Sequence, residues 1–416
     1  MDPKKVSTKQ SKNNFRSFLW HAVFLALASN FMDVNTIIPS MLIKAGGNSI
    51  HLGFLSAIML GGSGVFQLIF APILYKNVLK LKYLLLGINL RIAALFSISA
   101  MFFFSYSLKG NTIILLIFIL ISIFSFSGSY SNVSYIDILG KSVKEKSRKH
   151  FFSIKEIVSS IGIFISAIIV RDLIKKFDYP NNYSLLFLIA GILLLIASLG
   201  FWNLKEIAST NPVKRNLIDF FKLIPNEIKK NPNLKYYLLI INTLGLGIGF
   251  LPFLILFAKE NFLLSYKLIG NFLLFRIIGM LIASSIFYKL SKKINYKDLL
   301  IVAAIIGSLI PILALLLRNN QICYQFIFIL SGIFVSLFKI SNNGILLEIS
   351  TNENRTIYAG ISGAGKIFST IFPLIAGLLI FYTGFNTIFL IVSAIILFSY
   401  LFIKKLDCKV LISPKR

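Results

Sequence analysis

Long apolar runs separated by short polar segments dominate the sequence. A helix needs about 20 mostly apolar residues to cross the hydrocarbon core of a bilayer. The runs are uninterrupted rather than alternating, which is typical of membrane helices and not of barrel strands. The pattern therefore predicts an all-α polytopic membrane protein with about twelve spans. These spans are residues 17–43, 52–74, 83–106, 112–136, 153–172, 183–203, 236–258, 268–290, 299–317, 322–347, 357–382 and 385–403.

The composition supports this interpretation once the positions of the charges are considered. The chain is 56% hydrophobic and 14% charged, with a formal net charge of +28. Such a charge alone would suggest a nucleic-acid-binding protein. Most of the Lys and Arg residues lie in short clusters between apolar runs, where they set the orientation of membrane helices. The expected partner is therefore the lipid bilayer, and no nucleic acid.

The orientation follows from the same clusters. With the amino terminus inside, 30 of the 43 Lys and Arg residues lie in inside segments and 8 in outside loops. Positive charge collects on the cytoplasmic side of membrane proteins. This predicts a multi-pass protein of the cell (cytoplasmic) membrane with both termini in the cytoplasm.

The longest polar segment divides the spans into six and six, and we find the same residues at equal spacing on both sides. Tyr75-Lys76 recurs as Tyr288-Lys289, and Pro39 recurs as Pro252, both with an offset of 213 residues. The central segment reads equally well as a solvated linker or as a helix lying at the membrane surface. The predicted parts are a cytoplasmic tail 1–16, a six-helix half 17–203, a cytoplasmic central loop 204–235, a second six-helix half 236–403 and a cytoplasmic tail 404–416.

With twelve spans, two similar halves, both ends inside and a long basic central loop, the chain resembles the major facilitator superfamily. Short basic turns after spans two and eight add to the resemblance, at residues 71–82 and 288–293. These turns lack the Gly, Asp-Arg and Gly-Arg of the family signature, so no subfamily is assigned. The resemblance implies two pseudo-symmetric six-helix halves and secondary transport of a small solute by alternating access, without enzyme activity.

A charged side chain inside a span costs on the order of 2.5–3.5 kcal/mol on insertion scales, so each one needs a reason. Asp33 lies deep in the first span, about 16 residues from its start. In a continuous helix, Asn30 would share a face with it. A buried carboxyl at this depth could bind and release a proton during transport, which makes Asp33 the predicted coupling residue. The alternative is a polar contact between helices.

Four deeper cations outnumber this acid, which favours an anionic or zwitterionic solute. The alternatives are snorkelling by the lysines and ion pairing, for example between Arg91 and Asp137. Small or ring-constrained residues in spans one and seven are candidate hinges. The predicted solute-binding residues are Arg91, Arg276, Asn30, Asn35, Lys339 and Lys366, the gate or salt-bridge residues are Asp137, Arg148, Glu156, Glu348 and Arg355, and the hinge residues are Gly249, Pro252 and Pro39.

Other chemistry is poorly supported by the sequence. Residues 360–367 resemble a phosphate-binding loop but lack the Ser or Thr that should follow Lys366. No cofactor or metal ion is expected, and the protein is expected to be a monomer that binds a solute and protons. Two other classes stay open: a membrane-embedded enzyme acting on lipid-linked substrates, and a non-transporting receptor or assembly factor.

Overall fold

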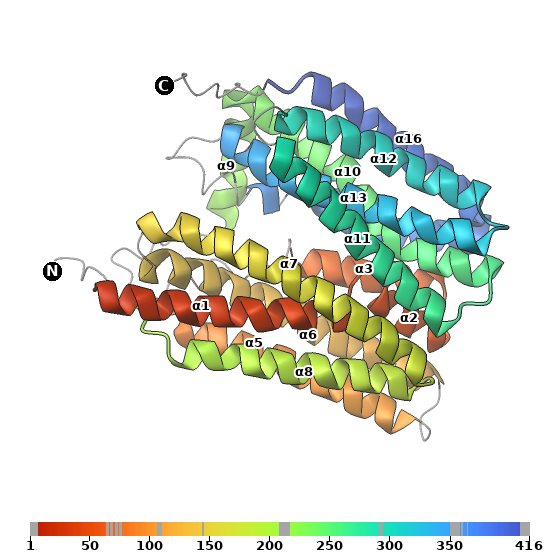
Figure 1. Cartoon of the computed structure of the whole chain (residues 1–416). Helices are drawn as coiled ribbons and strands as arrows, with labels where there is room; N and C mark the ends of the chain where they lie inside the picture. The colour runs from red at the N-terminus through yellow and green to blue at the C-terminus, as the bar shows by residue number, and fades with distance from the viewer. Residues whose placement is uncertain are drawn as a thin grey trace. The chain divides into compact units, whose positions relative to one another are not determined.

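The computed structural model shows helices and no strand among the residues it describes, as drawn in Figure 1. These are residues 7–63, 77–105, 110–143, 145–207, 217–290, 294–349, 361–363 and 365–407, with Phe66, Phe70, Leu74 and Tyr358. The elements before the central segment are α1 (Thr8–Ser29), the 3-10 turn η1 (Asn30–Met32), α2 (Ile37–Lys44), α3 (Ser49–Ser63), α5 (Leu81–Phe103), α6 (Gly110–Ser142), α7 (Glu145–Lys176) and α8 (Asn181–Trp202). Those after it are α9 (Leu217–Lys230), α10 (Pro232–Asn261), α11 (Tyr266–Leu290), α12 (Tyr296–Leu316), α13 (Gln321–Ile349), α15 (Ile367–Thr383) and α16 (Phe385–Lys404).

Among the described residues, each predicted span overlaps at least one helix. Within the described part of the chain, ten helical stretches are long and apolar enough to cross a membrane. The second predicted span falls on α3, whose apolar stretch Ser49–Gly62 is shorter. The fifth falls on α7, which is not among the ten and carries several charged residues. The predicted all-α polytopic fold is confirmed.

The chain divides into two compact units, and each has the same internal pairing of helices. The first unit is Met1–Leu217 with Ser265–Leu274, and the second is Ile218–Leu264 with Phe275–Arg416. In the first, α5 packs on α6 and α8, while α1 packs on α7 and α8. In the second, α12 packs on α13 and α16, while α10 packs on α15 and α16. The third span thus contacts the fourth and sixth in both units, as expected for a duplicated six-helix bundle.

Small residues allow close contacts between helices inside each unit. A Cβ on Gly87 of α5 would lie 2.8 Å from Cβ of Ser131 on α6. In the second unit, Cβ atoms on Gly247 of α10 and Gly307 of α12 would lie 2.8 and 2.7 Å from the ring of Phe334. In a bilayer, such packing drives helix association because lipid tails are as apolar as the side chains.

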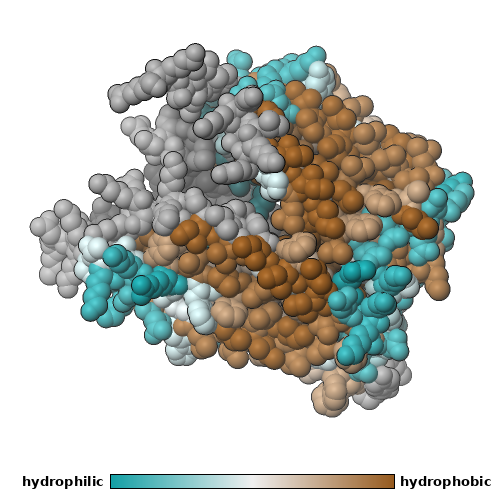
Figure 2. All heavy atoms as spheres, viewed as in Figure 1, coloured by the Kyte–Doolittle hydropathy of each residue, from teal (hydrophilic) through white to brown (hydrophobic). Residues whose placement is uncertain are grey.

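Many large apolar side chains remain exposed on the outer flanks of the helices, including Trp202, Leu316, Ile322 and Phe368. Figure 2 shows apolar residues covering much of the visible helix flanks, with hydrophilic residues gathered towards the ends of helices. Contact with lipid makes this exposure favourable in a membrane protein, whereas contiguous apolar patches of this kind are rare on soluble monomers.

A helix forms in the second part of the central segment, which the sequence left open between a linker and a surface helix. Helix α9 spans Leu217–Lys230 and ends immediately before α10. Asn231 separates them: its side-chain oxygen accepts a hydrogen bond from the backbone N–H of Asn233 at 3.1 Å. Its side-chain nitrogen donates to the carbonyl of Ile349 at 3.0 Å. Asn231 therefore caps the start of α10, directly after the helix of the central segment.

Candidate functional site

The first membrane span is broken where its apolar pattern predicted a continuous helix. Helix α1 ends at Ser29, a single 3-10 turn follows, and Asp33 has extended backbone dihedrals of φ −64 and ψ 126. One carboxylate oxygen of Asp33 accepts hydrogen bonds from the backbone N–H of Asn35 at 3.0 Å and from Thr36 Oγ1 at 2.7 Å. A broken helix in hydrocarbon leaves backbone groups that need partners, and Asp33 supplies an acceptor at this point.

The break is also fastened to the fifth span. The buried Asn30 donates from Nδ2 to the carbonyl of Ile163 at 2.5 Å and to Oγ of Ser166 at 2.9 Å, both on α7. The expected i, i+3 face shared with Asp33 is wrong, because the backbone there is not α-helical. Asn35 donates its backbone N–H to Asp33, and its side chain is partly exposed. Asn30 and Asn35, both predicted to bind solute, therefore lie in different surroundings.

Arg91 does not form the ion pair considered from sequence. Its guanidinium carbon lies 4.3 Å from the centre of the Phe124 ring on α6. A Cβ on Gly128 would lie 3.4 Å from Arg91 Nε, so the absence of a side chain there leaves room for the guanidinium. This Nε atom is buried and has no hydrogen-bond partner in the described structure. Arg91 therefore lies between α5 and α6 as a cation over an aromatic face, and Asp137 pairs with Lys80.

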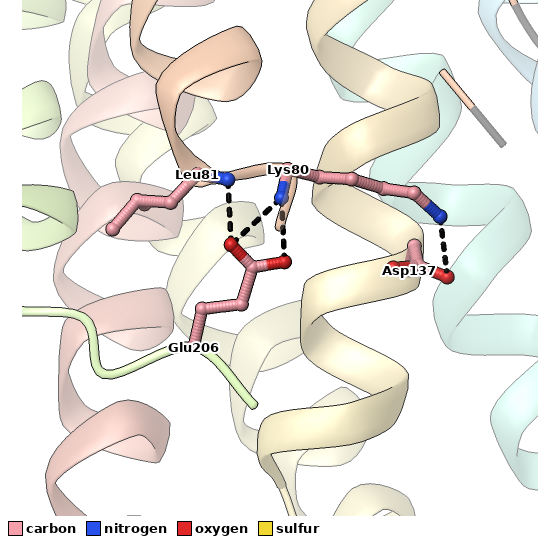
Figure 3. A network of polar contacts seen from close by, with 4 residues as sticks. All are labelled: Lys80, Leu81, Asp137 and Glu206. Atoms are coloured by element: carbon pink, nitrogen blue, oxygen red, sulfur yellow. Dashed lines mark hydrogen bonds and ion pairs between the residues drawn. The ribbon is translucent and has the colours of Figure 1, made fainter. Parts of the chain in front are cut away.

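The ionic contacts of Asp137 belong to a polar network at one end of the first unit, drawn in Figure 3. Lys80 Nζ lies 3.0 Å from Oδ1 of Asp137. The backbone N–H groups of Lys80 and Leu81, where α5 begins, donate to the carboxylate of Glu206 at 2.7–2.8 Å. A carboxylate at a helix N-terminus satisfies free N–H groups and meets the positive end of the helix dipole. The network joins the turn before α5, the end of α6 and the segment after α8.

In the second unit, Arg276 is buried at a tight crossing of α11 and α13. Only 4% of the surface of Arg276 is exposed. A Cβ on Gly332 of α13 would collide with the carbonyl of Arg276, and one on Gly279 of α11 would collide with the carbonyl of Ile329. These two glycines bring the backbones together, and the burial of Arg276 means that it does not snorkel to solvent.

The two lysines predicted to bind solute are placed differently. Lys339 on α13 is exposed. Lys366 is the residue before α15, because the eleventh span turns at residues 365–366 instead of running through them. The Lys366 carbonyl accepts from Thr370 N at 3.0 Å and from Ser369 Oγ at 2.9 Å. Lys366 therefore lies at a break, not inside a helix.

Asn242, which the sequence analysis did not select, contacts this second break. Its Nδ2 donates to the carbonyl of Gly365 at 2.5 Å and to that of Leu238 at 2.8 Å. An Asn in the first span of each unit thus donates to a backbone carbonyl of the fifth span: Asn30 to that of Ile163, and Asn242 to that of Gly365. An amide inside the apolar run 236–258 was the signal that could have identified it.

The remaining predicted residues are partly described. Glu348 is partly buried near the end of α13. Arg355 lies outside the described residues, as do the side chains of Arg148 and Glu156. The predicted hinge residues are buried: Gly249 and Pro252 lie within the continuous α10, and Pro39 lies in α2. Among the residues that the structure describes, no group of three or more His, Cys, Asp or Glu could hold a metal ion.

The comparisons with known proteins agree with this architecture. The family model of the Major Facilitator Superfamily matches residues 237–408. A crystal structure of a variant of the nucleoside transporter NupG superposes with a TM-score of 0.67 at 15% identity, over 94% of this chain and 99% of that one. The second half of the chain thus matches this family model, and the fold of the whole chain is similar to that of solved transporters.

Other solved structures of this fold are similar over almost the whole chain. A POT family transporter in complex with 5-aminolevulinic acid gives a TM-score of 0.68 at 14% identity, covering 97% of both chains. A bacterial metal transporter gives 0.64 at 13% identity, covering 94% of this chain and 98% of that one. No curated protein sequence matches significantly. At these identities the structures show the fold and assign no subfamily.

The turn after the second span has a role that its basic residues alone did not reveal. The sequence identified residues 71–82 as a degenerate form of the family signature. The structure shows that Lys80 from this turn is 2% exposed and pairs with Asp137. Glu206, which completes the network, was not predicted, because it lies 126 residues from Lys80 in a segment read as a linker.

Proposed function

We propose that the chain is a secondary active transporter that moves a small solute across the cytoplasmic membrane by alternating access, as a monomer and without enzyme activity of its own. The observation that carries this proposal is the major facilitator fold, which extends over 94–97% of the chain in comparisons with solved transporters. The distribution of 30 inside and 8 outside Lys and Arg residues supports cytoplasmic termini.

Proton coupling through Asp33 is the second part of the proposal. Asp33 lies at the break in the first span, where its carboxylate accepts two local hydrogen bonds. A partly buried acid beside unwound backbone is a suitable group for taking up and releasing a coupling ion, because transporters place such sites at interrupted helices. Protonation would change the hydrogen bonds that hold the break and so link proton binding to the shape of the span.

The third part concerns the solute, which we propose is anionic or zwitterionic. Arg91 and Arg276 lie within the helical parts of their units, and Arg91 lies over Phe124 instead of pairing with Asp137. Arg binds carboxylate and phosphate groups through a planar fork of donors. Lys366, at the break before α15, is a further cation beside unwound backbone. Together these residues outnumber Asp33 and favour a solute that carries negative charge.

Uptake into proteoliposomes made with the full-length protein tests the proposal. We expect one member of a panel of organic anions, amino acids, peptides and nucleosides to accumulate when a proton gradient is imposed. Asp33→Asn should abolish gradient-driven accumulation and keep counterflow of the same solute, because the amide oxygen still accepts both hydrogen bonds while the ionisable group is lost. Asp178→Asn, at an exposed acid between α7 and α8, is the matched control.

The solute class is tested separately. Arg276→Gln should raise the KM for an anionic solute at least tenfold, whereas Arg318→Gln, at an exposed arginine, should leave it unchanged. Intact gradient-driven uptake in Asp33→Asn would contradict proton coupling. Unchanged transport of every anion in Arg276→Gln would contradict the anionic solute, and the absence of transport of any solute would contradict the transporter itself.

A further inference from the structure

Each unit ends in a short exit segment that is bound back to the start of its own first helix by an asparagine. In the first unit, the buried Asn14 of α1 accepts a hydrogen bond on Oδ1 from Lys205 N at 3.2 Å and donates from Nδ2 to Lys205 O at 3.0 Å. The amide therefore pairs with both backbone groups of one residue, as a neighbouring strand would.

The second unit repeats this arrangement atom for atom. Asn233 of α10 accepts from Asp407 N at 3.0 Å and donates to Asp407 O at 3.0 Å. Lys205 lies three residues after the end of α8, and Asp407 lies three residues after the end of α16. We call each of these pairs, Asn14 with Lys205 and Asn233 with Asp407, an asparagine clasp.

The residues next to the clasps correspond as well. Leu204 and Leu406, each directly before the clasped residue, are 5% and 0% exposed. Their N–H groups donate to the carbonyls of Phe201 at 3.1 Å and Ile403 at 3.2 Å, three residues earlier in both cases. The match extends over backbone bonds, burial and spacing, so it reflects the duplicated architecture and not a coincidence of two surface contacts.

The exit segment in each unit also reaches the start of the third span, by different chemistry. In the first unit, Glu206 accepts the N–H groups of Lys80 and Leu81 where α5 begins (Figure 3). In the second, Lys297 in the first turn of α12 donates from Nζ to the carbonyls of Lys404 at 3.0 Å and Leu406 at 2.8 Å. Together with the clasps, these contacts join the first, third and sixth spans of each unit at one end.

We propose that the two asparagine clasps make each six-helix unit move as one body during transport, and that Asn14 and Asn233 are positioning residues for this movement. The transport part rests on the proposed function. Without a clasp, the exit segment could separate from the first helix of its unit. In the first unit, where the exit segment leads into the central segment, a pull from that segment would be absorbed at the separated end instead of moving the unit. An asparagine suits this position because its amide offers one acceptor to the N–H and one donor to the C=O of the same residue.

Hydrogen–deuterium exchange on the full-length protein tests the clasps directly. Asn14→Asp removes the donor and places a carboxylate against the Lys205 carbonyl. We expect the Lys205 amide to exchange on the order of tenfold faster, the change that follows from losing about one net hydrogen-bond contribution. Asn13→Asp, at the exposed neighbouring asparagine, should leave this exchange unchanged. In the second unit, Asn233→Asp should act on Asp407, with the exposed Asn226→Asp as its control.

Acidification gives a rescue that a general loss of stability would not show. Once protonated, the carboxyl of the Asn14→Asp variant has an O–H donor and a carbonyl acceptor in the amide geometry. Protection of Lys205 should therefore return at acidic pH, relative to Asn13→Asp at the same pH. If Asn14→Asp does not accumulate, Gln10→Ala removes a weaker donor to the same carbonyl, at 3.3 Å, and should raise exchange about twofold.

Transport supplies the functional measurement. In proteoliposomes, Asn14→Asp and Asn233→Asp should lower the maximal rate severalfold and leave KM unchanged, because neither residue belongs to the proposed solute or proton site. Unchanged exchange at both Lys205 and Asp407 would overturn the clasps, and unchanged maximal rates with faster exchange would overturn their role in movement. If the unaltered protein transports nothing, the proposed function fails while the exchange measurements still decide whether the clasps hold.

Discussion

The ammonium nitrogen of Lys80 lies 3.0 Å from a carboxylate oxygen of Asp137, at a lysine that is only 2% exposed. The lysine comes from the turn before α5 and the aspartate from α6, so the pair joins two neighbouring helices of the first unit. The backbone N–H of the same lysine donates to Glu206. The basic turn before α5 is therefore a buried junction, where this turn meets α6 and the segment after α8.

Lys80→Met should destabilise the protein by on the order of 3 kcal/mol, because removing one member of a buried ion pair leaves the charge of the other without its partner. Asp137→Asn should also be destabilising. The double variant should be more stable than Lys80→Met alone, since neither charge then remains. Melting of the purified protein in detergent measures all three, and Lys82→Met, at an exposed lysine two residues away, provides the control. Additive losses in the double variant would show that the two charges are not coupled.

Glu206→Ala should cost about 1–2 kcal/mol, the range for losing a cap at a helix N-terminus. The carboxylate accepts the N–H groups of both Lys80 and Leu81, so its loss leaves two donors unsatisfied. Glu206→Gln should cost less, because the amide keeps one oxygen acceptor. Exchange of the first amides of α5 should rise in the same order. Glu227→Gln is the comparison, since Glu227 is bonded to Lys230 within one exposed turn of α9; an equal loss there would contradict the capping role.

The architecture was predictable because hydrocarbon imposes a strong pattern on sequence. A chain crossing a bilayer must hide its backbone polar groups in helices, so runs such as 183–203 identify spans without further information. The positions of the helix breaks were harder to predict from the sequence. Asp33 was placed by counting residues along a continuous helix, but its extended backbone interrupts that helix. Lys366 was likewise placed inside a span that turns at residues 365–366.

The contacts of the candidate residues depended on distances that a single sequence does not contain. Arg91 and Asp137 were a reasonable ion pair from charge and depth, yet Asp137 pairs with Lys80 and Arg91 lies over Phe124. The clasp between Asn14 and Lys205 joins residues 191 positions apart. Asparagine in a polar turn or near a helix start is too common to identify such a contact, so repetition in the second unit was needed to reveal it.

Gly332→Ala should be strongly destabilising, by about 1–3 kcal/mol or more, because a methyl group would overlap the carbonyl of Arg276 on α11. The collision involves backbone on both sides, so no side chain can move aside to relieve it. Gly363→Ala in the same unit is the control, since a Cβ there meets nothing within 4 Å. Melting temperature and the fraction of monodisperse protein measure the effect. Equal behaviour of the two variants would mean that α11 and α13 do not cross as closely as described.

Asn30 and Asn35, both predicted from sequence as solute-binding residues, should respond differently to replacement by alanine. Asn30→Ala removes the hydrogen bonds to Ile163 and Ser166 of α7 and should lower stability by about 1–3 kcal/mol, because the carbonyl and hydroxyl partners stay buried. Asn35→Ala keeps its backbone N–H bond to Asp33, so stability should change by less than about 0.5 kcal/mol, as at sites away from such features. If its side chain binds solute, KM should rise instead. Thermal melting together with uptake kinetics separates the two roles, and a stability loss in Asn35→Ala equal to that in Asn30→Ala would show that both asparagines only hold the broken span together.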